Sequence, residues 1–285
     1  MPIKKLTSWF GRNPKVESKA YQVCSEGHCS PLDAYYDAFS GGQFEIPVSR
    51  CRSSLLGFKP DQSPFFNTLK AYERGRTSFQ QSPLATYYRQ FQPKTMADVL
   101  GFKSETLDRF HAMATVMPWS HVHPHQRFER FCVNSSDPGG LFLSKEGAQH
   151  GLQPGKDYGC QFFGPVSDAH GELEFQRLIS VYERISEDGF QPQQFGYIHG
   201  EFLIDGNNWV WIAIGGKHRF AVLSALGFER IPIANRARWS AMFVRRSEVD
   251  FWPNVRNGLF SRDEALDVFD RFMVGVDGYG SLYSN

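Results

Sequence analysis

The chain has 285 residues, of which 41% are hydrophobic and 15% aromatic, and its 31 lysines and arginines nearly balance its 30 aspartates and glutamates. This apolar content is enough for a packed core, which excludes a wholly disordered chain, and at about 150 residues per domain the length predicts about two domains. The net charge of +1 gives no general attraction to nucleic acid or to an anionic membrane, so it argues against a DNA-binding protein.

Neither a membrane segment nor a secretory signal stands out in the sequence. The longest uninterrupted apolar run, Trp209–Ile214, is far shorter than the roughly 20 residues that span a bilayer, and the first residues lack the apolar segment of a signal peptide. The cysteines are odd in number and widely spread, at Cys24, Cys29, Cys51, Cys132 and Cys160. This pattern does not suit a disulfide framework, and we expect a cytoplasmic protein with reduced thiols.

For residues 1–157 the sequence predicts an N-terminal lobe that is mainly helical and irregular. We expect this lobe to be an accessory unit or a unit that binds a second substrate, the acceptor of a transferred group. Short helices are expected around Pro31–Phe39, Pro64–Tyr72, Pro83–Phe91 and Thr95–Phe110. A proline at the start supports the second and third of these helices, because proline is well suited to the first helical position. The stretch Asp137–Gly155, rich in glycine and proline, predicts an irregular connection.

Residues 158–235 predict a compact core, which begins with a long amphipathic helix over Gly171–Asp188. Its apolar stripe recurs at i, i+3, i+4 and i+7, through Leu178, Val181, Tyr182 and Ile185. Gly189 provides the stop, because glycine readily adopts the left-handed conformation that ends a helix.

A β-hairpin and a short helix follow within the same core. The runs Tyr197–Ile204 and Trp209–Ile214 are rich in strand-forming residues, and the turn residues between them, Asp205–Asn208, tolerate the positive φ of a tight hairpin. A helix over Phe220–Leu226 and a strand over Arg230–Ala234 complete the unit.

Residues 236–285 predict a C-terminal helical extension. Ser261 and Glu264 form a capping box, in which each side chain bonds the other residue's backbone amide at a helix start. The apolar face of that helix consists of Leu266, Phe269, Phe272 and Met273.

An anion site is predicted where the second hairpin strand meets the short helix. Gly215 and Gly216 let the backbone approach a ligand closely, and the amides at the following helix start carry the positive end of the helix dipole. Lys217, His218 and Arg219 add basic side chains, of which arginine suits the oxygens of a phosphate group. The expected ligand is a polyphosphate; the alternative is a tight turn followed by a solvated helix start.

The segment Gly164–Ala234 resembles the ParB/sulfiredoxin fold. The resemblance rests on the ordered elements above and on Gly215–Ile233, which reads GGKHRFAVLSALGFERIPI. Sulfiredoxins carry a similar Gly-Gly-Cys-His-Arg that holds ATP phosphates, ParB proteins bind CTP at this place, and free-serine kinases of the fold transfer phosphate from a nucleotide. The whole chain is also similar to bacterial ParB-like proteins often associated with envelope polysaccharide genes. The resemblance implies a mixed α/β fold with a ParB/sulfiredoxin-like core.

Two departures narrow what the resemblance implies. Lys217 stands where sulfiredoxins have their reactive cysteine, so that thiol chemistry has no residue to perform it. Only about 50 residues with one clear helix follow the core, and together with the balanced charge this makes us expect neither the helical DNA-binding module nor the chromosome partitioning of ParB.

The interpretation that remains is an ATP- or ADP-dependent kinase, with Mg²⁺, that acts on a hydroxyl of a small molecule or sugar. The residues assigned to the nucleotide phosphates are Gly215, Gly216, Lys217, His218, Arg219 and Arg177. The catalytic candidates are Asp168, Glu172, Glu174 and Lys217. The acidic residues are also explained as favoured partners of a helix N-terminus, and Arg177 as an i, i+3 partner of Glu174. The alternatives are a non-catalytic nucleotide-binding switch and, with less support, a ParB-like nuclease.

The remaining polar clusters are interpreted as structural. His121, His123 and His125 alternate along one segment, but no further ligand completes a zinc or nickel site, and we expect surface or substrate-lining histidines. Asp205 is explained by the hairpin turn, while Glu201 on the first hairpin strand could face either way. No metal site is predicted. Walker A, Rossmann and Gly-x-Ser-x-Gly motifs are absent from the sequence.

Overall fold

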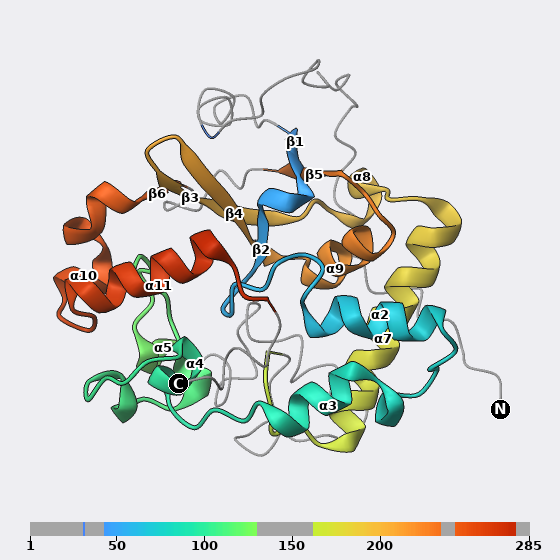
Figure 1. Cartoon of the computed structure of the whole chain (residues 1–285), viewed down its shortest axis with the longest axis horizontal. Coiled ribbons are helices and arrows are strands. Elements are labelled where there is room, and N and C mark those ends of the chain that lie inside the picture. The colour runs from blue at the N-terminus through green and yellow to red at the C-terminus, as the bar shows by residue number, and fades with distance from the viewer. Residues whose placement is uncertain (1–30, 32–42, 130–161, 235–242, 278–285) are drawn as a thin grey trace.

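The helices and strands of the chain form a mixed α/β structure with two sheets, and this fold class is the one expected from the sequence (Figure 1). The computed structural model describes residue 31 and residues 43–129, 162–234 and 243–277. The strands are β1 Gln43–Pro47, β2 Cys51–Ser53, β3 His199–Asp205, β4 Asn208–Gly215, β5 Arg230–Ala234 and β6 Phe243–Arg245. The α-helices are α2 Pro64–Glu73, α3 Pro83–Gln90, α4 Met96–Leu100, α5 Pro124–Phe128, α7 Asp168–Asp188, α8 Pro192–Phe195, α9 Lys217–Ala225, α10 Pro253–Arg256 and α11 Arg262–Val274. Short 3-10 helices lie at Val48–Arg50, Phe79–Gln81, Leu107–Arg109, Ala112–Ala114 and Arg246–Phe251.

The larger sheet has four strands in the order β2-β4-β3-β6. The predicted hairpin forms its centre, with β3 and β4 antiparallel and Asp205 opposite Asn208. Strand β2 adds to β4 in parallel and β6 adds to β3 in parallel. The smaller sheet pairs β1 with β5 antiparallel. Strands from all three segments that the sequence analysis separated, 1–157, 158–235 and 236–285, therefore meet in the four-stranded sheet.

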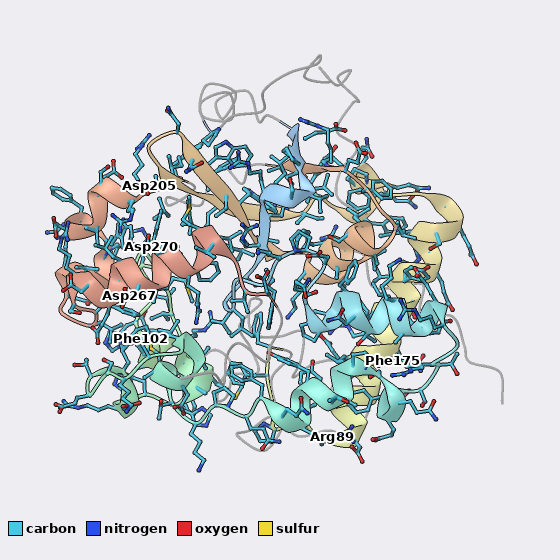
Figure 2. The ribbon with its side chains drawn as sticks, in the orientation of Figure 1. Arg89, Phe102, Phe175, Asp205, Asp267 and Asp270 are labelled. Carbon is cyan, nitrogen blue, oxygen red and sulfur yellow. The ribbon has the colours of Figure 1, made fainter. Side chains whose placement is uncertain are left out.

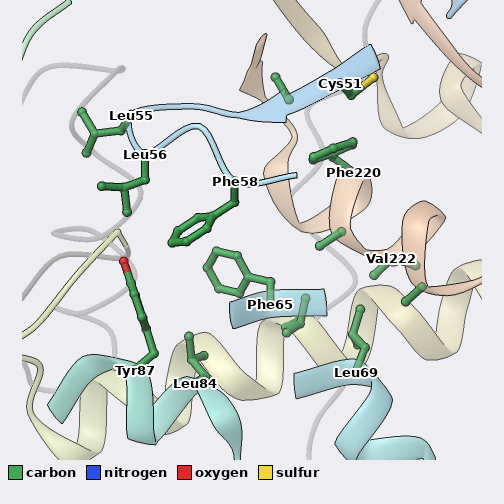
Figure 3. Packing of buried hydrophobic residues seen from close by; sticks show 14 of the residues in the cluster. Cys51, Leu55, Leu56, Phe58, Phe65, Leu69, Leu84, Tyr87, Phe220 and Val222 are labelled. Carbon is green, nitrogen blue, oxygen red and sulfur yellow. The ribbon is translucent and has the colours of Figure 1, made fainter. Parts of the chain in front are cut away.

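Each face of the four-stranded sheet covers its own hydrophobic cluster, because successive side chains of a strand point to opposite faces. Phe202 and Trp211 enter the cluster with α2, α3, α7 and α9, whereas Leu203 and Ile212 enter the cluster with α4 and α11. Figure 1 shows these two groups of helices on opposite sides of the sheet. Figure 3 shows the first cluster, where Phe65 and Leu69 of α2 lie close to Phe220 and Val222 of α9.

The helices that the sequence predicts from their first residues are confirmed. Ser63 and Ser82 accept hydrogen bonds from the third helical amides of α2 and α3, and a proline occupies the first position of both helices. The capping box of Ser261 and Glu264 opens α11. Long helix α7 ends at Gly189, as expected, and begins three residues before the predicted start.

Two further predicted helices also differ from their expected bounds. The helix expected over Thr95–Phe110 is only Met96–Leu100, because Gly101 takes a left-handed conformation with φ of 77° and ends it. The helix expected from Phe220 begins already at Lys217, so its first turn carries the basic residues. Three predicted features lie outside the described residues: the Pro31–Phe39 helix beyond Pro31, the Asp137–Gly155 connection, and all the cysteines except Cys51.

A buried arginine connects the N-terminal part of the chain to the end of α11. The Arg52 guanidinium donates to the carbonyl oxygens of Phe272 at 3.0 Å and Met273 at 3.1 Å. These carbonyls belong to the last turn of α11, where the helix itself provides no donors. Within the described ranges, no helix combines the length and the apolar character needed to cross a membrane.

Candidate functional site

The site begins at the turn between β4 and α9. β4 ends at Gly215, and Gly216 forms the N-cap of α9 with φ of 84° and ψ of 30°. A Cβ at Gly216 would be strained by this positive φ and would lie 2.8 Å from a guanidinium nitrogen of Arg219. The turn therefore requires glycine at this position. Because Gly216 has no side chain, it cannot accept from the amides of the first helical turn, which remain directed outward.

A buried carboxylate, Glu174, lies beneath this turn. Its side chain is 1% exposed and comes from the second turn of α7. One carboxylate oxygen lies 2.9 Å from His218 Nε2 of α9, and the other accepts from Arg177 Nη1 at 2.9 Å. The predicted pairing of Arg177 with Glu174 is present, and it coexists with the pairing to His218. Helix α7 thus meets the first turn of α9 through polar side chains.

The charges of this cluster control one another's pKa values. Burial by itself raises the pKa of Glu174, but attraction to His218, Arg177 and Lys217 outweighs burial and holds that pKa well below its usual range. For His218, burial lowers the pKa from 6.5; Arg177 and Lys217 lower it further, and Glu174 opposes them. At neutral pH the cluster therefore contains an ionised Glu174 and a neutral His218. Since an ionised carboxylate can only accept hydrogen bonds, Nε2 of the neutral His218 carries the ring proton and donates a hydrogen bond to Glu174.

Lys217 is held by aromatic rings. Its Nζ lies 3.8 Å from the centre of the Phe162 ring and 5.9 Å from that of Phe65. A cation over a ring face is attracted by the negative face of the π system. Phe65 also meets the imidazole of His218 edge to face, with centroids 5.0 Å apart. Phe65 and Phe162 are therefore parts of the site that the sequence analysis missed, since a single phenylalanine carries no signal in the sequence beyond packing.

Arg219 faces a different part of the structure. Its Nη1 donates to the carbonyl of Phe195 at 2.8 Å and to that of Gly196, and its Nη2 donates to that of Tyr197 at 3.4 Å. Three successive carbonyls at the end of α8 thus share one guanidinium. The sequence assigned this guanidinium to phosphate oxygens, whereas its donors here are directed to the backbone.

The other acidic candidates do not join the cluster. Asp168 and Glu172 are exposed, and Glu172 accepts from Gln176 on the surface. Successive helical residues are turned by about 100°, so Glu172 lies nearly opposite to Glu174 on α7. Ser167 is the N-cap of α7 and accepts from the amide of His170. Of the four catalytic candidates, the structure brings together Glu174 and Lys217.

A second buried carboxyl belongs to Glu201, which faces the cluster that contains α11. It accepts a hydrogen bond from Trp119 Nε1 at 2.6 Å. Although the residue keeps some exposed surface, burial of the carboxyl raises its pKa to about 7, and the bond from Trp119 opposes this shift. The sequence left the direction of Glu201 open, and the partner that settles it lies 82 residues away.

The histidine segment and the hairpin aspartate that the sequence singled out make local structural contacts. His123 is the N-cap of α5 and accepts from the amide of His125, on whose ring it stacks at 5.1 Å. No group of three or more potential metal ligands occurs among the residues that the structure describes. Asp205 closes the hairpin and lies near Asp270 of α11 (Figure 2), with Arg246 between them at 3.9 Å and 2.9 Å.

Comparisons of this chain with protein-family models, with curated proteins and with solved structures found no match. A function for this chain is therefore inferred from the residues of the site and their contacts.

Proposed function

We propose that this chain is a nucleotide-dependent phosphotransferase, a kinase that moves a phosphoryl group from ATP, ADP or another nucleotide to a hydroxyl of a small molecule or sugar. The observation that carries the proposal is the charged cluster of Glu174, Arg177, Lys217 and His218 at the N-terminus of α9. Buried ionisable groups cost stability unless they are paired, and such clusters concentrate at functional sites.

The charge of the cluster suits a phosphate. With His218 neutral, the two cations of Arg177 and Lys217 exceed the one anion of Glu174, which leaves a net charge of about +1 before the helix dipole is added. The outward amides of α9 add fixed donors of the kind that bind anions at helix N-termini. Arg177 keeps 22% of its side chain exposed, so part of this positive charge reaches solvent.

The resemblance of Gly164–Ala234 to the ParB/sulfiredoxin fold supports the same ligand, because members of that fold bind nucleotide phosphates at the corresponding glycine turn. The similarity to ParB-like proteins associated with envelope polysaccharide genes supports a sugar as the acceptor.

Magnesium would enter this site already bound to the nucleotide, and not as an ion held by the protein. Carboxylate oxygens are the ligands that Mg²⁺ takes from proteins, but both oxygens of Glu174 are already engaged and Asp168 and Glu172 lie on other sides of α7. These described residues therefore do not form a protein site for the ion, and we assign no step to it.

A thermal-shift screen with ATP, ADP, CTP and GTP, each with Mg²⁺, tests the proposal. A ligand that binds only the folded chain at about 100 times its Kd stabilises it by about 2.7 kcal/mol, so one nucleotide should raise the Tm by several degrees. Lys217→Met should remove this shift. Arg184→Met is the matched control, because Arg184 is an exposed cation of α7 that lies outside the cluster at the start of α9. If no nucleotide raises the Tm, the proposal is wrong.

A non-catalytic nucleotide switch is the second candidate, and the enclosure of Glu174 favours it. A carboxylate with both oxygens engaged is poorly placed to take a proton from a hydroxyl. Transfer of radiolabelled phosphate to candidate acceptors separates the two functions. The kinase gives a labelled product, whereas the switch gives only the nucleotide-dependent Tm increase.

A further inference from the structure

We infer that His218, and not Glu174, is the group that takes the proton from the acceptor hydroxyl, and that Glu174 is a positioning residue that acts through His218. The sequence placed the base among the acidic residues of α7 and gave His218 to the phosphates. This inference rests on the proposed kinase function, which supplies the acceptor hydroxyl. The protonation state and accessibility of His218 can be measured without any kinase activity.

The geometry excludes Glu174 from direct contact with a substrate. Its two oxygens are held by His218 and Arg177, each at 2.9 Å, and its side chain is 1% exposed. A general base must lie within hydrogen-bond reach of the proton that it removes. Glu174 meets that condition only for the protons on His218 Nε2 and Arg177 Nη1, which belong to the protein itself.

His218 has the open position that Glu174 lacks. Its side chain is 12% exposed, and its Nε2 is taken by Glu174. Among the residues that the structure describes, none makes a hydrogen bond to Nδ1. This atom is also not enclosed by the protein, so it keeps contact with solvent. In the tautomer that donates through Nε2, Nδ1 carries the free lone pair.

The groups around the imidazole keep it ready to accept a proton. Glu174 and Arg177 face it from α7, Lys217 from its own helix, and the uncharged ring of Phe65 from α2. Burial and the two cations lower the pKa of His218 from 6.5, so the base is neutral at physiological pH. Glu174 counters the new charge when the imidazole becomes protonated, which is how a buried carboxylate assists a histidine base.

The proton of the acceptor hydroxyl moves to His218 Nδ1 while the hydroxyl oxygen forms a bond to the terminal phosphorus of the nucleotide. The bond from that phosphorus to the bridging oxygen breaks, and the shortened nucleotide leaves with the electron pair. His218 is then an imidazolium whose Nε2–H faces ionised Glu174, and it returns its proton to solvent after product release.

Modification with diethyl pyrocarbonate tests the state of His218 without any nucleotide, because this reagent modifies a histidine only at an accessible, unprotonated imidazole nitrogen. We expect peptide mapping of the wild-type chain to find His218 modified, with a midpoint below pH 6.5 in its rate profile. In Glu174→Gln the midpoint should move to lower pH, because the anion that favours the protonated ring is gone. Exposed His121 serves as the internal control for reagent activity.

Turnover gives the second readout. His218→Gln keeps an N–H donor for Glu174 but removes the base, so kcat should fall by about 10²–10⁴-fold while the nucleotide-induced Tm shift stays unchanged. Loss of the Tm shift together with kcat would make His218 a phosphate ligand and overturn the inference. An unmodified His218 beside a modified His121 would also overturn it. A reactive His218 in a chain that transfers no phosphate would refute the kinase and with it the role of His218 as base for an acceptor hydroxyl, and would show only that His218 is neutral and accessible.

Discussion

Replacing Glu201 by glutamine should change how the stability of the protein depends on pH. The carboxyl of Glu201 is enclosed at the face of β3 that packs against the α11 cluster, with Trp119 Nε1 as its donor at 2.6 Å. Glutamine has nearly the same shape, and its side-chain oxygen can accept the same hydrogen bond. The substitution therefore removes the ionisation and keeps the packing.

The size of the effect follows from the pKa of Glu201, which burial raises from 4.5 to about 7. The folded chain binds this proton more tightly than the unfolded chain, so the stabilisation is fully present below pH 4.5 and is lost as the pH rises through about 7. A difference of about 2.5 pKa units corresponds to roughly 3 kcal/mol. Between about pH 4.5 and pH 8, Glu201→Gln should therefore gain roughly 3 kcal/mol of unfolding free energy relative to the wild type.

Urea unfolding followed by circular dichroism at several pH values measures this difference. The contributions of Glu174 and His218 are present in both chains and cancel in the comparison. Glu248→Gln is the matched control, because it makes the same substitution at a carboxyl that is about half exposed beside Arg245. Parallel profiles for Glu201→Gln and the wild type would refute the reasoning, since they would mean that the carboxyl ionises as it does in the unfolded chain.

Three further predictions concern the stability of the chain or the reactivity of its side chains. Arg219→Lys should cost about 1–3 kcal/mol in urea unfolding, because the carbonyls are bonded by two separate guanidinium nitrogens, Nη1 and Nη2, whose positions a single ammonium nitrogen cannot both occupy, whereas Arg184→Lys should cost little. Ser261→Ala should cost about 1 kcal/mol by loss of the capping bond to the Glu264 amide, and Ser261→Asp should restore it; equal stability of all three chains would contradict the capping role. Cys51 is fully buried and burial raises the pKa of its thiol, so iodoacetamide should label it only on unfolding, as measured by peptide mass mapping; rapid labelling of the native chain at pH 8 would contradict this.

The local elements near the site were predictable because their signals lie within a few residues of one another. The i, i+3, i+4 stripe of α7, the turn residues of the β3–β4 hairpin and the Gly-Gly start of α9 each depend on neighbours along the chain. The prediction for Thr95–Phe110 was wrong in length because the left-handed Gly101 overrides the apolar content that follows it.

The partners within the site were less predictable because they come from distant parts of the chain. His218 meets Glu174 across 44 residues, and Phe65 of α2 reaches His218 only through the packing of α2 on α9. A carboxylate in the first turns of a helix has several equivalent explanations in the sequence. Only its burial and its partners distinguish Glu174 from Asp168 and Glu172.

The sequence by itself determined the mixed α/β content, the hairpin, the helix boundaries marked by caps and glycines, and the concentration of basic residues after Gly216. Tertiary structure decided what those residues contact. Arg219 carries donors for any nearby acceptor, and the course of the chain at Phe195–Tyr197 supplies backbone carbonyls. The physical reason is that side-chain chemistry specifies which interactions are possible, while long-range packing specifies which acceptors lie within hydrogen-bond distance.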